Sequence, residues 1–298
     1  MNKTTIAIII PWFGPWPTWM DLFIHSSRCN ETIDFILFSD QELPAYAKNI
    51  NNIHFKKSTF KDYCSLVSQS LDIDFHPANP YKLCDLKPYY GYIHQEIIKK
   101  YDFWGFGDLD LVWGDIRHFY TEQLLKNHDI LSTHSDRLSG HLTLVRNTSY
   151  YNTLALKLPR WKELLTSPDN QAIDEIHFTL KIYPWAKLLW KVHKHIFLRF
   201  HIQDEWAAYN NFCHKANRIL LNRKYFFVEH NTTPWNDGDM PQKEWLYKNG
   251  HVYDTKTNEE LIYLHFLVMK KQWVGDYYHP SSNGSVISFK GFQPYEEV

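Results

Sequence analysis

The sequence lacks any long hydrophobic run. No segment approaches the roughly 18 uninterrupted apolar residues that predict a membrane-spanning helix. The first apolar run, residues 6–10, ends at Pro11 and is too short for the apolar region and cleavage site of a signal peptide. We therefore expect a cytoplasmic protein.

Cysteine motifs and a strong net charge are also absent. The four cysteines are scattered and form no CxxC pair, which argues against a zinc site or a disulfide framework. The formal net charge of the 298 residues is -1, so no overall positive field draws nucleic acid, and we expect no nucleic-acid partner. Aromatic residues make up 17% of the chain, which suits either an aromatic core or the stacking of flat ligands.

Acidic residues are missing from one long stretch, residues 176–203. That stretch instead combines basic residues with Trp, Tyr, Phe and Leu side chains. Such a segment can lie on an anionic membrane surface, but an ordinary helix with solvated lysines and core aromatics has the same composition. Residues 181–200 are therefore our candidate for peripheral contact with the inner, cytoplasmic face of a membrane.

The pattern of apolar runs predicts an α/β fold. Residues 6–10 are continuously apolar and mostly β-branched, as in a central parallel strand, and a Pro/Gly-rich loop follows. Helical spacing predicts helices over 19–29 and 80–100, with Pro88 in the first turn of the second. Further strands are predicted at 35–38, 53–55, 103–107, 130–132, 142–145 and 261–266. We expect an open mixed sheet flanked by helices in one domain, 1–298, with a helical C-terminal elaboration over 174–211.

Two carboxylates at the end of a predicted strand are the sharpest local feature. Asp108 and Asp110 follow the aromatic strand 103–107, and the carboxyl ends of strands in open α/β sheets are where ligands bind. A carboxylate pair there can converge on a hard cation. The same residues can equally be loop acids or a helix cap.

The stretch 101–115, YDFWGFGDLDLVWGD, together with YKLCDLKP at 81–88, resembles the GT-A glycosyltransferases. It is similar in particular to bacterial transferases of capsule and O-antigen polysaccharide assembly. The resemblance implies a GT-A-like (Rossmann-like) fold with a nucleotide-sugar-binding half, about 1–150, and an acceptor-side half, about 151–298. It also implies that Asp108 and Asp110 hold Mn²⁺ or Mg²⁺ on the diphosphate of a nucleotide-sugar donor.

The resemblance assigns further residues to the donor. A late histidine, here His265, is a third metal ligand in many such enzymes, and nearby lysines, here Lys270 and Lys271, contact the phosphates. The predicted donor site is completed by the loop after the first strand, by a strand-end acid and by a charged segment: Pro11, Trp12, Phe13, Gly14, Asp40, Lys82, Asp85 and Lys87. For the last three, a solvated helical face with charge pairing is equally compatible.

The acceptor side is less clearly marked. Asp204 and Glu205 begin a predicted helix and are candidates for the catalytic acid or base, although an N-cap is an equal interpretation. Arg137, Gly140 and His141 lie in a loop that we expect to face the acceptor. The implied acceptor is a glycan or a lipid-linked glycan.

The expected function is a metal-dependent hexosyltransferase that uses a UDP-sugar, with galactose in the pyranose or furanose form as the first donor to consider. One alternative is a carbohydrate-binding or assembly protein without catalytic activity, which has little need of a metal site. Another is a metal-dependent nucleotidyltransferase. Such enzymes usually carry a Gly-rich loop with a cation after the first strand, whereas residues 11–16 have aromatics and no cation.

Overall fold

The computed structural model describes residues 3–199, 205–230, 243–267, 269–271, 273 and 284–295. A seven-stranded mixed sheet forms its centre, in the order β3-β2-β1-β4-β7-β6-β8. Its strands are β1 (Ile6–Pro11), β2 (Ile33–Ser39), β3 (Ile53–Lys57), β4 (Phe103–Gly107), β6 (Ile130–Ser132), β7 (Leu142–Arg146) and β8 (Tyr225–Phe227). The pairs β1–β2, β2–β3, β1–β4 and β6–β8 are parallel, and β7 runs antiparallel to β4 and β6. The predicted α/β class, an open mixed sheet flanked by helices, is confirmed.

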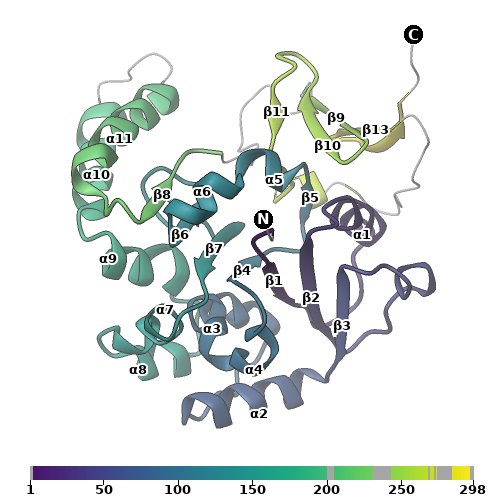
Figure 1. The fold of residues 1–298 in the computed structure, drawn as a ribbon, viewed down its shortest axis with the longest axis horizontal. Coiled ribbons are helices and arrows are strands. Elements are labelled where there is room, and N and C mark those ends of the chain that lie inside the picture. The colour runs from purple at the N-terminus through teal and green to yellow at the C-terminus, as the bar shows by residue number, and fades with distance from the viewer. Residues whose placement is uncertain are drawn as a thin grey trace.

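Helices cover the sheet and extend beyond it (Figure 1). The first half contributes α1 (Met20–Cys29), α2 (Phe60–Leu71), α3 (Tyr90–Ile93), α4 (Gln95–Ile98), α5 (Ile116–Phe119) and α6 (Glu122–Asn127). The second half contributes α7 (Ser149–Asn152), α8 (Trp161–Thr166), α9 (Thr179–Ile182), α10 (Ala186–Val192) and α11 (Glu205–Leu220). No helix in these parts of the chain is long and apolar enough to cross a bilayer.

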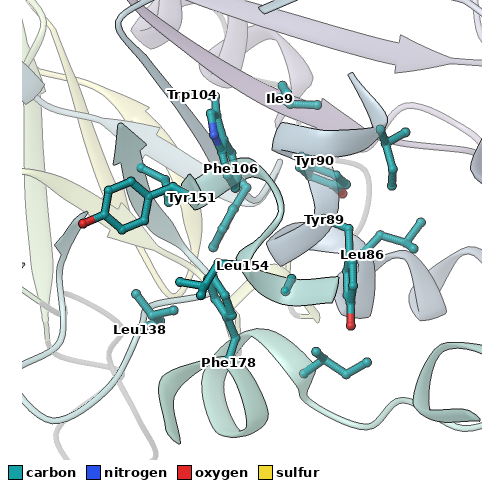
Figure 2. Packing of buried hydrophobic residues seen from close by; sticks show 14 of the residues in the cluster. Ile9, Leu86, Tyr89, Tyr90, Trp104, Phe106, Leu138, Tyr151, Leu154 and Phe178 are labelled. Atoms are coloured by element: carbon teal, nitrogen blue, oxygen red, sulfur yellow. The ribbon is translucent and has the colours of Figure 1, made fainter. Parts of the chain in front are cut away.

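Both faces of the central strands are buried, as the apolar run at 6–10 predicts. Ile6, Ile8 and Ile10 of β1 join the core that includes α1, while Ala7 and Ile9 join the opposite core. Figure 2 shows that second core, where Trp104 and Phe106 of β4 pack with Tyr89 and Tyr90. This alternation explains why the strand has no polar face.

The predicted single helix over 80–100 is wrong. The chain forms a 3₁₀ helix, η2 (Pro80–Tyr89), followed by the short helices α3 and α4, which are separated at His94. Pro88 lies inside η2 rather than in a first turn, and because proline has no N–H it cannot continue an α-helical hydrogen-bond ladder. Gly91 follows, and a Cβ there would lie 2.5 Å from the Trp104 ring, so only glycine permits this close packing.

The C-terminal part contains strands that the sequence pattern did not predict. The predicted late strand is present as β11 (Glu260–Leu261) and β12 (Tyr263–His265), and β12 pairs with β5 (Leu111–Trp113). The remaining strands form a five-stranded antiparallel sheet with β11: β9 (Glu244–Lys248), β10 (His251–Asp254), β13 (Ser285–Ser288) and β14 (Gly291–Pro294). The helical elaboration is also interrupted, because π-helical turns occupy η4 (Ile173–Phe178) and η5 (His193–Phe197).

A buried histidine in the core makes folding sensitive to acid. His94 stacks on Phe38 with ring centroids 4.8 Å apart, and its Nε2 lies 3.0 Å from the Tyr63 hydroxyl. Burial lowers the pKa of His94 from 6.5 to about 3. The unfolded chain therefore binds a proton at a pH where the folded chain does not. The stability that neutral His94 contributes is complete above pH 6.5 and is lost as the pH falls toward 3.

We expect His94→Phe to reduce the acid sensitivity of folding. A histidine with these two pKa values lowers the free energy of unfolding by roughly 2 kcal/mol between pH 7 and pH 5. Urea unfolding at both pH values should show that the variant loses most of this difference. His195→Phe, at an exposed histidine, should behave like the wild type. An unchanged pH dependence in His94→Phe would contradict the assignment.

Candidate functional site

A large cavity opens at the carboxyl ends of β1 and β4. These two strands are parallel neighbours, so both end at the same edge of the sheet. The cavity has a volume of about 990 Å³. Residues from distant segments line it: Pro11, Trp12 and Phe13; Tyr81 and Lys87; Asp108 and Asp110; His134, Arg137, Gly140 and His141; Asp174, Glu175 and Ile176; Trp190; His265 and Lys270.

The aromatic loop 11–13 lines the cavity and is held in place by contacts with residues outside the lining. The Phe13 ring packs on Phe60 and Tyr63, with both centroid distances 5.4 Å, and the Trp12 indole donates to the Pro15 carbonyl over 3.1 Å. Gly14 adopts φ +107°, a conformation that favours glycine, and its N–H donates to Asp40 Oδ1 over 3.0 Å. Gly14 and Asp40 thus shape the loop, while neither lines the cavity.

Asp110 lies at the junction of the central sheet with the C-terminal part. Strand β12 pairs with β5 so that His265 is opposite Leu111, which places His265 Nε2 3.2 Å from Asp110 Oδ2. Lys270, on the short helix η7 (Met269–Lys271), forms an ion pair with the same carboxylate. Burial opposes ionisation of Asp110, but the charges of His265 and Lys270 and their hydrogen bonds prevail and hold its pKa well below the usual range.

Asp108, His141 and His265 form a cluster suited to a metal ion. One ligand atom from each lies within 4.8 Å of the others. Burial is the main cause that lowers the pKa of His141, and the neighbouring charges of His265, His134 and Lys87 act in the same direction. A neutral imidazole has the lone pair that a metal requires. Two imidazoles and a carboxylate fit Mn²⁺ or Fe²⁺ better than Mg²⁺, which prefers oxygen ligands.

The cluster differs in one member from the predicted metal set. Asp108 and His265 were predicted ligands and lie together as expected. His141, predicted to face the acceptor, takes the third position, while Asp110 contacts His265 from the side of Lys270. The sequence gives no signal that His141 is a metal ligand, because it is one of 17 histidines and lies in a loop.

Lys87 supplies a buried positive charge beside the cluster. Its Nζ lies 2.6 Å from Asp108 Oδ1, donates to the Gly140 carbonyl over 3.0 Å and lies 3.8 Å from Asp174 Oδ2. Burial disfavours its charge, but Asp108 and Asp174 outweigh burial and raise the pKa of Lys87 well above its ordinary value. The lysine therefore stays protonated at the cavity wall.

Asp174 and Glu175 were not predicted, although both line the cavity. Burial raises the pKa of Asp174 to about 7, and the charge of Lys87 opposes that shift. Glu175 accepts a hydrogen bond from the Gly140 N–H over 3.2 Å. Arg137, on the same side, pairs with Asp136 at 2.9 Å. These groups make this end of the cavity polar and rich in charge.

Other predicted site residues lie elsewhere. Lys82 and Asp85 do not line the cavity but form a buried pair 2.8 Å apart. Glu205 is also absent from the lining and contacts His193 Nε2 over 2.6 Å. Asp204 and the side chain of Lys271 lie outside the described residues.

Residues 8–296 match DUF6625, a family of unknown function. The chain belongs to this family. No curated protein matches the chain.

The fold is similar to those of three solved glycosyltransferases at low identity. The galactosyltransferase LgtC with donor and acceptor sugar analogues is 10% identical, with 57% of this chain and 71% of that chain covered and a TM-score of 0.34. GlyE of Streptococcus pneumoniae is 11% identical, with 61% and 43% covered and a TM-score of 0.35. Mouse xyloside xylosyltransferase 1 is 10% identical, with 90% and 98% covered and a TM-score of 0.36.

Metal titration on single variants tests the cluster. We expect Mn²⁺ to bind the wild type in calorimetry. Loss of a residue that only supports a metal-coordinating side chain lowers metal affinity by roughly 10- to 100-fold. His141→Gln removes a coordinating side chain and should lower the affinity for Mn²⁺ by more than that. The loss of affinity in Asp110→Asn should stay within roughly 10- to 100-fold, because Asp110 contacts His265 but is not a member of the cluster.

His128→Gln is the control, since His128 lies outside both the cavity lining and the cluster. It should bind Mn²⁺ like the wild type. Normal binding by His141→Gln together with complete loss in Asp110→Asn would instead favour the predicted set Asp108, Asp110 and His265.

Proposed function

We propose that this chain is a metal-dependent glycosyltransferase that moves a sugar from a nucleotide-sugar donor to a glycan acceptor. One observation carries the proposal: a cluster that could hold a metal ion and two lysines, Lys87 and Lys270, line one cavity together with an aromatic loop and several charged groups. A nucleoside diphosphate has a flat base, a diphosphate and a sugar. The cavity offers complementary chemistry to each of the three in one volume of about 990 Å³.

The aromatic loop suits the nucleobase. Trp12 lines the cavity, and its ring is fixed by the hydrogen bond to Pro15, so stacking on a base costs little conformational entropy. A loop without a cation disfavours transfer of the nucleotidyl group itself, because that reaction places a phosphate at the same loop.

The cluster and the lysines suit the diphosphate. Asp108, His141 and His265 would hold Mn²⁺, which supplies charge neutralisation to the leaving diphosphate. Lys270 lies at the cavity wall and can exchange its contact with Asp110 for a phosphate oxygen. Lys87 is fixed by Asp108 and Gly140 and contributes a permanent positive charge. Together these groups favour departure of a nucleoside diphosphate as the bond from the sugar to the diphosphate breaks.

The polar wall suits the sugar and the acceptor. Asp174, with a pKa raised to about 7, and Glu175 are carboxyl groups in the cavity that can accept the proton of an acceptor hydroxyl. We propose them for this role in place of Glu205, which contacts His193. The assignment of Asp204 stays a prediction. Arg137 and Gly140 lie on the same side and would orient the hydroxyl groups.

The finer assignment follows from the motif resemblance. We propose a UDP-sugar as donor, with galactose in either ring form first in the screen. We propose a bacterial surface polysaccharide, capsule or O-antigen, as the pathway that uses the product.

Nucleotide-dependent stabilisation tests the proposal. We expect one nucleoside diphosphate, UDP first, to raise the melting temperature only when Mn²⁺ is present. A ligand at about 100 times its Kd adds roughly 2.7 kcal/mol to the free energy of unfolding. Lys270→Met should weaken nucleotide binding by roughly 10- to 100-fold, because it removes a charge-assisted hydrogen bond to phosphate.

Lys126→Met, at an exposed lysine outside the cavity, is the control and should bind the nucleotide normally. The nucleotide that binds is then supplied as a series of nucleotide-sugars, and release of the nucleoside diphosphate is measured. Absence of stabilisation by every nucleotide, with and without Mn²⁺, would overturn the transferase and favour a carbohydrate-binding protein.

A further inference from the structure

One end of the molecule carries a cluster of exposed cations. Helices α9 and α10 and the turn η5 occupy most of the acid-free stretch, and with α11 they lie at the edge of the molecule opposite β3 (Figure 1). Five basic side chains here are exposed, and none forms an ion pair with another residue of the described ranges: Lys181, Lys187, Lys191, Lys194 and Arg199. Because the whole chain has a net charge of -1, this concentration of positive charge is local.

Large apolar side chains are exposed among these cations. Trp185 is 52% exposed and Leu188 is 48% exposed. Beyond α10, Ile196 is 46% exposed and Leu198 is 47% exposed. Among the aromatic residues Tyr183 is buried, as in an ordinary helix with an aromatic core, whereas Trp185 is exposed. A helix that contacts only water is not expected to expose several large apolar side chains next to one another.

The cations and the exposed apolar residues of α10 share one side of the helix. At about 100° per residue, Lys187, Lys191, Leu188 and Trp185 fall within one arc. Ala186 and Leu189 point the other way and are buried. We call the outward arc, with Lys194 and Ile196 beyond it, the α10 face. It has the composition of a helix that lies in the plane of a membrane interface.

Helix α10 also contributes to the cavity lining, on a side other than the α10 face. Trp190, on α10 itself, lines the cavity, and so does Ile176, which is 44% exposed. The helix that carries the α10 face thus also carries a residue of the cavity lining.

We propose that the α10 face binds peripherally to a lipid bilayer that contains anionic headgroups. Lysines attract the headgroups while Trp185, Leu188 and Ile196 enter the boundary between headgroups and acyl chains. A nucleic acid would match the lysines but not the exposed aliphatic side chains, and a second copy of the chain would bring two positive faces together. Bilayer binding requires no donor nucleotide, so it stands apart from the proposed transferase. If both hold, the transferase acts at a membrane surface, which suits a lipid-linked acceptor.

Cosedimentation with vesicles tests the proposal on the full chain. We expect the wild type to bind phosphatidylcholine vesicles that contain phosphatidylglycerol, and to bind pure phosphatidylcholine far more weakly. Salt should weaken the binding. Each lysine near an anionic surface contributes roughly fivefold to partitioning, so Lys187→Ala with Lys191→Ala should lower it roughly 25-fold. Trp185→Ser should also lower it, at unchanged melting temperature.

Matched controls use exposed residues elsewhere. Lys61→Ala with Lys126→Ala changes the net charge by the same amount, and Tyr150→Ser removes an aromatic ring that is 56% exposed. Both should bind the vesicles like the wild type. Equal losses in the controls, no binding to anionic vesicles, binding of single-stranded RNA in place of vesicles, or a dimer that Trp185→Ser disperses would each overturn the proposal. None of these results affects nucleotide-dependent stabilisation, so the two proposals fail separately.

Discussion

The pairing of β12 with β5 is the constraint on which the candidate site depends. It joins segments about half the chain apart, and the contact of His265 with Asp110 spans 155 residues. Two short strands could not remain paired alone. Their outer side is covered by the five-stranded sheet, whose Trp245, Tyr247 and Ile287 share an apolar cluster with Val112 and Leu264. The C-terminal part thus positions the histidine and the lysine that complete the site.

Charge within the cavity is arranged so that each buried group has a partner. Lys87 lies between Asp108 and Asp174, and Lys270 with His265 compensates Asp110. Burying such groups is costly, and replacing them by apolar residues would often stabilise a protein. The charged groups that remain in this cavity can give up their contacts with one another and bind charged groups of a ligand instead. A cation on Asp108 and a phosphate on Lys270 would each take the place of a contact that already exists.

The sequence predicts the first half of the fold well because local patterns decide it. The run at 6–10 and the aromatic strand 103–107 appear as β1 and β4, and Asp108 lies at the strand end as predicted. The prediction of a helix over 80–100 was wrong because the spacing of apolar residues takes no account of two features. Pro88 cannot continue the α-helical hydrogen bonds, and Gly91 packs closely on Trp104. The place of His141 in the metal cluster, instead of on the acceptor side, and the place of Asp174 in the cavity could not be predicted, since both depend on tertiary packing. The antiparallel sheet was missed because its strands are short, although the turn Asn249-Gly250 marks the hairpin of β9 and β10 in the sequence.

Lys82 and Asp85 illustrate how a residue can control a binding wall without touching it. Asp85 accepts the N–H groups of Gln171 and Ile173, at 2.8 and 3.0 Å, and Lys82 donates to the carbonyls of Leu164 and Asp169. The pair therefore anchors the turn that leads into Asp174. Loss of either side chain would displace Asp174 without removing a group that lines the cavity. A residue that anchors a wall of the cavity and a residue that contacts the ligand can therefore give the same loss of binding when they are mutated. A structure of the variant separates the two cases.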